Sequence, residues 1–246
     1  MAKKIVLLTG SPRRKGNTAQ MADALAAALE EKGCRVVRFD TAFLPLGGCR
    51  DCRACYRGEG ACAFGGDGFN DIARELETAD GLVLAAPVYW YTFPAQIKHV
   101  IDRFVSLYNA KKFPAGIPAA LITCCAEPAM DTFDGIVFAY RKTVSLLGCR
   151  NVGEVLIPGV YGAGEISQTD GLAQARALAG GAGAVADELR QLLAHRAGFG
   201  LFVAALHVVQ HPFERVATHR GITAIVHVLE LDVLFSGTEQ DHFVHV

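Results

Sequence analysis

The sequence predicts an α/β protein in which a doubly wound parallel sheet is covered by helices on both faces, and three observations support this. Short apolar runs rich in β-branched residues alternate along the chain with segments of helical periodicity. The runs are mostly apolar, as expected of strands buried on both faces. Of the 246 residues, 51% are hydrophobic, which is enough for a sizeable core. Strands joined in this way by helices run parallel, with right-handed crossovers.

Five runs are predicted to form the buried strands of this sheet. They read KKIVLLTG, CRVVRFD, GLVLAAPV, IPAALITCC and NVGEVLIPGV, at residues 3–10, 34–40, 81–88, 117–125 and 151–160. The simplest architecture for five such strands with intervening helices is a flavodoxin-like doubly wound sheet. A ligand of this sheet is expected at the carboxyl ends of the strands, where the strand order reverses.

Helical segments fill the intervals between these runs. Thr18 is expected to cap the first helix, and residues 69–80 (FNDIARELETAD) predict a helix before the third strand. Apolar residues at i, i+3 and i+4 predict a helix over 97–108. The charged residues of that helix are expected on the surface, with an ion pair between two of them: Lys98, His99, Asp102 and Arg103. Further helices fit residues 130–147 and 168–195.

Composition and charge exclude several classes of protein. The formal net charge is −1, so there is no electrostatic argument for binding nucleic acid or an anionic membrane. The apolar run near the N-terminus is about five residues long, too short for a signal peptide or a membrane span, and a cytoplasmic location is expected. In the cytoplasm the eight cysteines would stay reduced or bind metal.

The loop after the first strand has the composition of an anion-binding site. Residues 10–18 read GSPRRKGNT and combine glycines, hydroxyls, an amide and Arg13 at the start of a helix. Main-chain N–H groups point outward there, and the helix dipole favours negative charge. The loop is not a Walker A motif, because five residues separate its glycines and Asn17 occupies the lysine position. A phosphate monoester bound without Mg²⁺ fits this loop, and a polar turn with no ligand is the alternative.

The loop after the third strand is rich in aromatic residues. It carries the only tryptophan, Trp90, between Tyr89 and Tyr91. Aromatic side chains at a wet sheet edge can pack a flat, conjugated ligand or can simply cap the core. In combination with the phosphate-binding loop they favour flavin mononucleotide (FMN).

Four cysteines between residues 49 and 62 are spaced C-x₂-C-x₂-C-x₆-C. This is close to the bacterial ferredoxin run C-x₂-C-x₂-C-x₃-C-P, with a longer last gap and no proline. Three thiolates within seven residues can cover one face of a cubane cluster, and the fourth closes the site. A [4Fe–4S] cluster is therefore expected on Cys49, Cys52, Cys55 and Cys62. Zinc is an open alternative. Interleaved arginines would offset the charge of a cluster or are ordinary surface residues: Arg50, Arg53 and Arg57.

Three motifs occur in the chain in a characteristic order: GSPRRKGNT, GCRDCRACYRGEGAC and ADGLVLAAPVYWYTFPAQIKHVIDRF. In this order they resemble the NAD(P)H-dependent FMN reductases of flavodoxin-like fold, particularly the iron–sulfur flavoprotein branch, over roughly residues 3–190. The resemblance implies an FMN phosphate held by Ser11, Arg13, Gly16, Asn17 and Thr18. It implies an isoalloxazine ring lined by Pro87, Val88, Tyr89, Trp90 and Tyr91, with Thr123 and Cys124 near its other edge. Relatives without a cluster carry similar cysteines, so unliganded thiols are also an open alternative.

The predicted function is that of an FMN-dependent oxidoreductase. Electrons would come from NAD(P)H or a ferredoxin and pass to a small acceptor such as a quinone or free flavin, by way of the cluster where one is bound. The cofactor carries out this chemistry, so no catalytic acid–base residue is expected. Two alternatives are a non-enzymatic flavin and iron–sulfur electron carrier and a zinc-binding protein. The resemblance also implies a homo-oligomer with flavin sites near subunit interfaces.

The chain is expected to contain two parts. Residues 1–195 would form the FMN-binding domain, with a cysteine-rich loop at 47–68, and residues 196–246 a histidine-rich extension. Seven of the eight histidines fall in the last 52 residues, but their spacing matches no ligand motif. An oligomerisation arm, a metal site and a loosely packed extension remain open for this segment.

Overall fold

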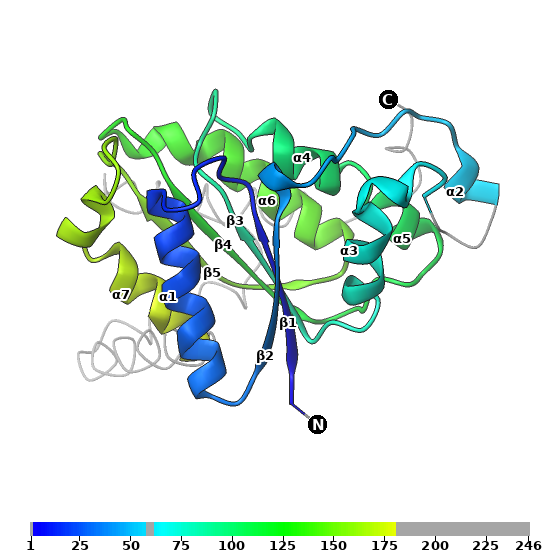
Figure 1. Cartoon of the computed structure of the whole chain (residues 1–246), viewed down its shortest axis with the longest axis horizontal. Helices are drawn as coiled ribbons and strands as arrows, with labels where there is room; N and C mark the ends of the chain where they lie inside the picture. The colour runs from blue at the N-terminus through cyan, green and yellow to red at the C-terminus, as the bar shows by residue number, and fades with distance from the viewer. Residues whose placement is uncertain (1, 58–61, 181–246) are drawn as a thin grey trace, which may run out of the picture. The chain divides into compact units, whose positions relative to one another are not determined.

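The computed structural model describes residues 2–57 and 62–180, and these ranges contain a five-stranded parallel sheet. The strand order is β2-β1-β3-β4-β5 (Figure 1). The strands are Lys4–Thr9 (β1), Arg35–Asp40 (β2), Gly81–Ala85 (β3), Pro118–Cys124 (β4) and Arg150–Ile157 (β5). The predicted flavodoxin-like doubly wound fold is confirmed.

Helices lie on both faces of the sheet. Within the described ranges they are Asn17–Glu31 (α1), Ala54–Arg57 (α2), Phe69–Leu76 (α3), Ala95–Ile101 (α4), Val105–Asn109 (α5), Asp134–Leu146 (α6) and Gly171–Ala177 (α7). Helices α1 and α7 pack on one face, and α3, α4, α5 and α6 on the other (Figure 1). Among the residues described, no helix has the length and apolarity needed to cross a membrane.

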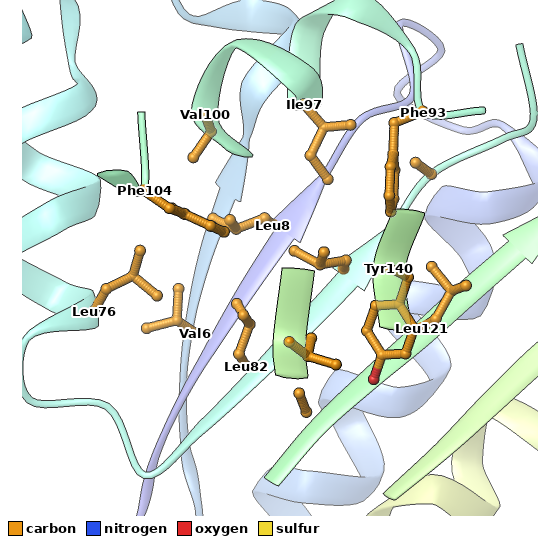
Figure 2. Close-up of a cluster of buried hydrophobic side chains, with 14 of the residues drawn as sticks. Val6, Leu8, Leu76, Leu82, Phe93, Ile97, Val100, Phe104, Leu121 and Tyr140 are labelled. Carbon is orange, nitrogen blue, oxygen red and sulfur yellow. The ribbon is translucent and has the colours of Figure 1, made fainter. Parts of the chain in front are cut away.

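Each central strand contributes to two hydrophobic cores, one on each face of the sheet. In β1, Ile5 and Leu7 pack with the residues of α1, whereas Val6 and Leu8 pack with those of α3 and α4. Figure 2 shows the second core between the sheet and its helices. Full burial of such a side chain contributes about 1.5–3 kcal/mol, which explains why the middle of each central strand, such as residues 5–8 of β1, contains no polar residue.

The first helix begins before the predicted cap. Gly16 is the N-cap of α1, with extended backbone angles (φ −69°, ψ 167°), and no side chain caps the helix. Thr18 instead lies inside the first turn and is only 2% exposed. Its hydroxyl contacts the sulfur of Cys124 at 3.3 Å, so it is not available to cap the helix.

The helix predicted over 97–108 is interrupted. Residues 102–104 separate α4 from α5, and the N–H groups of Arg103 and Phe104 donate to Val100 and Ile101, three residues earlier. These shorter-range bonds tighten the chain at the point where the Arg103 side chain turns into the interior. The helix predicted over 130–147 begins as a 3₁₀ turn at Met130–Phe133 and continues as α6. Of the helix predicted over 168–195, the described part contains α7 and the 3₁₀ turn Leu178–Gly180. Residues 181–195 and 196–246 lie outside the described residues.

The strand order reverses between β1 and β3. From β1 the chain passes to β2 on one side, and the later strands continue on the other side from β3. The N–H of Gly10 donates to Ala85 O at 2.8 Å, so the loops that follow β1 and β3 leave the sheet side by side. A Cβ at Gly10 would lie 2.8 Å from Cγ2 of Ile97, and the close packing of α4 therefore requires glycine there.

Candidate functional site

The loop after β1 leaves the first turn of α1 open. Ser11 Oγ accepts a hydrogen bond from Arg13 N at 3.2 Å, and Gly16 N donates to Arg13 O at 3.0 Å, which closes the loop on itself. Ser11 and Gly16 are buried, whereas residues 12–15 are exposed. Because no side chain caps α1, its first N–H groups are free of the carboxylate or hydroxyl that usually occupies them. The arrangement can bind an anion.

Asn17 connects this loop to the one that follows β5. Its Nδ2 donates to Gly162 O at 2.8 Å, and its Oδ1 accepts from Gly164 N at 2.9 Å. Glu165 reinforces the second loop, since its Oε2 accepts from Gly162 N at 2.8 Å. Both ends of the Asn17 amide are therefore engaged with the protein, and in this structure the side chain acts as a link between loops.

Two residues at the end of β4 carry buried polar groups, and as consecutive strand residues they point to opposite faces of the sheet. Cys124 is 4% exposed and contacts Thr18; burial raises the pKa of its thiol, against an opposing effect of the Thr18 hydrogen bond. Thr123 is fully buried, and its Oγ1 has no hydrogen-bond partner. A buried hydroxyl without a partner is uncommon in a folded protein, and a bound ligand is one way to supply the missing partner.

The loop after β3 forms a tight and strained turn. Tyr89 N donates to Thr92 O at 3.0 Å and Thr92 N to Tyr89 O at 3.1 Å, while Trp90 and Tyr91 have φ of 48° and 64°. These are the features of a type I′ turn, which normally contains Asn-Gly. Each non-glycine residue in the left-handed region costs about 1 kcal/mol or more, and such strain is concentrated at functional sites. The turn leaves Trp90 93% exposed.

The first turn of α6 supports this aromatic turn. A Cβ on Gly135 would lie 2.3 Å from the carbonyl oxygen of Tyr91, so only glycine allows the two segments to approach. The predicted flavin contacts at residues 87–91 thus lie on a loop held by β4 and α6, since Val88 N also donates to Cys124 O at 3.1 Å. The loops after β1, β3, β4 and β5 are joined at one edge of the sheet.

The cysteine-rich loop begins after β2 and ends at α3. Cys49 and Cys52 are exposed, and Cys55 and Cys62 are half-buried. Burial is the main cause of a raised pKa at Cys55, and the other three thiols of the motif raise that pKa further. In the ranges 2–57 and 62–180, no three His, Cys, Asp or Glu side chains form a group that could hold a metal ion.

Two residues between these cysteines have left-handed backbone conformations. Asp51 has φ of 46° and Arg53 φ of 57°, so the chain turns sharply on both sides of Cys52. Left-handed residues of this kind are a component of the main-chain nests that surround anions and iron–sulfur clusters. The arginines interleaved with the cysteines, Arg50, Arg53 and Arg57, are exposed. The guanidinium of Arg50 lies 4.5 Å from the ring centroid of Phe64.

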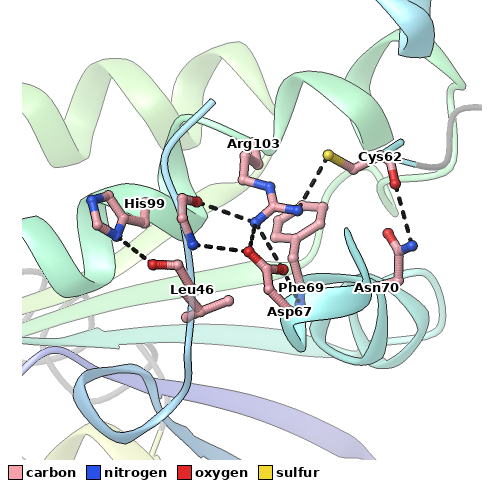
Figure 3. Close-up of polar contacts among 8 residues, drawn as sticks. Leu46, Cys62, Asp67, Phe69, Asn70, His99 and Arg103 are labelled. Carbon is pink, nitrogen blue, oxygen red and sulfur yellow. Dashed lines mark hydrogen bonds and ion pairs between the residues drawn. The ribbon is translucent and has the colours of Figure 1, made fainter. Parts of the chain in front are cut away.

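The prediction of a surface position for Arg103 is wrong. Its side chain is 2% exposed and forms an ion pair with Asp67, whose Oδ2 lies 2.8 Å from Nη1. Nη1 also donates to Gly47 O at 3.2 Å, and Nη2 to Cys62 Sγ at 3.2 Å (Figure 3). The physical reason is the interruption between α4 and α5, where hydrogen bonds to the residue three positions earlier tighten the chain and turn the Arg103 side chain toward the core. The expected ion pair between Lys98 and Asp102 does form on the surface.

Comparisons with known proteins agree with the architecture. The family described as NADPH-dependent FMN reductase matches residues 3–157. An iron-sulfur flavoprotein of Archaeoglobus fulgidus is 34% identical over 102 residues, which is 42% of this chain and 46% of the relative. One from Methanosarcina thermophila is 35% identical over 107 residues, covering 42% and 53%. The chain thus spans about half the length of these relatives.

Two further similarities concern quinone reductases. An FMN-dependent NADH:quinone oxidoreductase of Bordetella parapertussis is 30% identical over 117 residues, covering 44% of this chain and 56% of the relative. Among solved structures, the NAD(P)H:quinone oxidoreductase from Methanothermobacter marburgensis has a TM-score of 0.58 at 17% identity. It covers 73% of this chain and 95% of that one. At this identity the structural likeness supports the fold.

Proposed function

This chain belongs to the NADPH-dependent FMN reductase family, and from that premise we propose that it binds FMN and transfers electrons from NADPH or NADH to a small acceptor such as a quinone. The observation that carries the proposal is the uncapped N-terminus of α1 at the point where the strand order reverses. A phosphate is the ligand chemistry that fits such a terminus best. When bound, FMN would supply the hydride and electron chemistry.

The residues around this edge fit a phosphorylated flavin. We assign the phosphate to the main-chain N–H groups of the first turn of α1, with Ser11, Arg13, Gly16 and Thr18 around it. Asn17 would act mainly by holding the neighbouring loop, since its amide is bonded at both ends. The aromatic turn would lie along the ring, with Pro87, Val88, Tyr89, Trp90 and Tyr91. Thr123 and Cys124, at the end of β4, would lie near its other edge.

Thr123 provides a test of the flavin site that does not depend on turnover. Thr123→Val is expected to raise the free energy of unfolding of the flavin-free protein by about 1 kcal/mol, because it removes a buried hydroxyl without a partner. The same change should weaken FMN binding about tenfold if the hydroxyl contacts the ligand, or about 1.4 kcal/mol. Denaturation and flavin titration measure the two effects.

Thr9 is the matched control for this variant. It is equally buried at the end of β1, but its hydroxyl donates to Asp40 Oδ1 at 2.6 Å. Thr9→Val should therefore destabilise the flavin-free protein, the opposite sign to Thr123→Val. If both variants are destabilised and both bind FMN as wild type does, the assignment of Thr123 to the ligand fails.

We further propose that the cysteine-rich loop holds a [4Fe–4S] cluster on Cys49, Cys52, Cys55 and Cys62. Three observations support this: the names of several relatives, the spacing of the cysteines, and the left-handed residues between them. When bound, the cluster would supply one-electron transfer. Exposed arginines beside the cysteines would favour an acidic protein donor such as a ferredoxin: Arg50, Arg53 and Arg57.

One set of measurements on protein purified without oxygen tests both proposals. We expect flavin bands, about four irons and four sulfides per chain, and oxidation of NADPH when a quinone such as menadione is added. Serine at any one of the four cysteines should remove most of the iron, whereas Cys34→Ser, at a half-buried cysteine packed in the core with α1, should keep it. Flavin and iron without NADPH oxidation would indicate an electron carrier. Zinc without flavin would overturn both proposals.

A further inference from the structure

The buried Arg103 side chain joins both limbs of the cysteine-rich loop to the end of α4. Nη1 donates to the carbonyl of Gly47, where the loop begins, and to both carboxylate oxygens of Asp67, where it ends, at 3.0 and 2.8 Å. Asp67 in turn accepts from Gly47 N at 2.8 Å, so the two limbs are also bonded to each other. Figure 3 shows these contacts converging on one guanidinium.

Cys62 is held at both its sulfur and its main chain. Arg103 Nη2 donates to Cys62 Sγ at 3.2 Å. The Cys62 carbonyl accepts from Asn70 Nδ2 at 3.3 Å and from Gly65 N at 3.0 Å. Asn70 packs so closely there that a Cβ on Gly65 would lie 2.0 Å from its Oδ1. The position and orientation of this thiol are therefore set by the fold, whereas Cys49 and Cys52 are exposed.

A guanidinium has properties suited to a permanent partner of a thiolate. It stays charged at every pH at which the protein is folded, and its planar fork can bond two groups at once. In Arg103, Nη1 donates to the Asp67 carboxylate and Nη2 donates to the Cys62 sulfur. The Phe69 ring, 4.2 Å from Cζ, covers the group and helps to exclude water, which strengthens the contact with the sulfur.

We propose that Arg103 is a positioning residue for the cluster, which holds the Cys62 thiolate in place and raises the reduction potential through its N–H···S contact. The inference rests on the proposed cluster. Reduction adds one electron to a site that is already negative, and a buried cation and a hydrogen bond at one ligand sulfur stabilise the reduced state more than the oxidised one. The charge of Arg103 thus favours acceptance of the electron, and no bond is made or broken.

The test compares variants of the anaerobically purified protein by a redox titration followed by EPR. The double variant Arg103→Met with Asp67→Asn removes the ion pair without leaving either charge buried alone. At the wild-type midpoint we expect its ratio of reduced to oxidised cluster to fall about tenfold, which is about 59 mV for one electron. Asp67→Asn alone keeps the guanidinium on Cys62 and should shift the ratio by less than about threefold.

Two further variants test whether the effect comes from the contact between Arg103 and Cys62 or from the general loss of a charge or of structure. Arg141→Met removes an arginine of α6 that pairs with Glu154 of β5, outside the cysteine-rich loop, and should leave the potential unchanged. Arg103→Lys keeps the charge. This variant should therefore hold more iron, and keep more of the wild-type reduction potential, than the double variant does. Loss of iron in the double variant and its return with lysine would support the positioning role. Wild-type potential and iron content in the double variant would overturn it.

Hydrogen exchange keeps this inference separate from the presence of a cluster. In the metal-free protein, peptides covering residues 44–48 and 62–69 should exchange at least about tenfold faster in the double variant, while β4 is unchanged. If the wild-type protein binds no iron, the proposed cluster fails, and this comparison still decides whether Arg103 holds the loop. If both limbs exchange at the same rate in the double variant as in the wild-type protein, Arg103 does not hold the loop.

Discussion

Replacing Asp67 with alanine is expected to lower the free energy of unfolding by about 3–5 kcal/mol. The carboxylate accepts hydrogen bonds from Arg103 and from the main-chain N–H groups of Gly47 and Phe69. Alanine would leave the guanidinium of Arg103, which is 2% exposed, without its counter-charge. Removal of one partner of a buried pair is far more costly than removal of both. Chemical denaturation of the metal-free protein measures the change.

Asp71 provides the control for this prediction. It lies on α3 and pairs with Arg74 at the surface, where the side chains are 64% and 69% exposed. Asp71→Ala should change the free energy of unfolding by less than about 1 kcal/mol, because solvent screens such a pair. Equal losses in the two variants would contradict the importance of the Arg103 contact.

The acid dependence of stability should change in the same variant. Burial alone would raise the pKa of Asp67, but the hydrogen bonds from Arg103 and the main chain outweigh it and lower that pKa below its ordinary value of 3.8. The stability that Asp67 contributes is therefore fully present above about pH 4 and is lost as the pH falls through the lowered pKa. Asp67→Ala should lose less stability than wild type on acidification from about pH 5 to pH 2.

The fold could be predicted from the sequence because its central strands are buried on both faces. Val6 and Leu8 face one core and Ile5 and Leu7 the other, so residues 5–8 are all apolar and lack the alternation of a half-exposed strand. The ends of the elements were less predictable. Thr18 has the composition of a cap, but contact with Cys124 takes its hydroxyl into the interior, and no local pattern carries that long-range information.

Arg103 shows where the prediction of the site failed and what signal was available. The residue follows Val100 by three positions and precedes Leu107 by four, and both are buried, so a helix that contained them could turn it toward the core. A charge at such a position indicates a buried partner. The partner, Asp67, lies 36 residues earlier in a glycine-rich loop, and nothing in the spacing connects the two.

The aromatic turn shows a second limit. Type I′ turns are recognised by Asn-Gly, and the sequence Tyr-Trp-Tyr-Thr gives no such signal. The positive φ values of Trp90 and Tyr91 depend on contacts with β4 and with Gly135 of α6. The sequence identified the aromatic residues but not the strained backbone that exposes them, since tertiary contacts decide it.

Replacing Ser11 with aspartate is expected to weaken FMN binding about 100-fold or more, which is at least about 2.7 kcal/mol. Ser11 is 7% exposed, and its Oγ would lie 3.1 Å from a Cβ on Gly16, the N-cap of α1. A carboxylate there would repel a phosphate at the same helix end. Two unit charges about 4 Å apart repel by about 4 kcal/mol at an effective dielectric constant of 20. A weakening of FMN binding by about 100-fold is therefore a lower estimate of the effect.

Ser11→Asn and riboflavin provide the controls that assign the effect to the phosphate. Asparagine has the shape of aspartate without its charge and should weaken FMN binding by less than about tenfold. Riboflavin lacks the phosphate, so its dissociation constant should change by less than about threefold in Ser11→Asp. The melting temperature of the flavin-free Ser11→Asp protein should not fall, because a carboxylate stabilises a helix N-terminus. Equal losses of FMN and riboflavin would mean that the ring site was damaged, and unchanged FMN binding would place the phosphate away from α1.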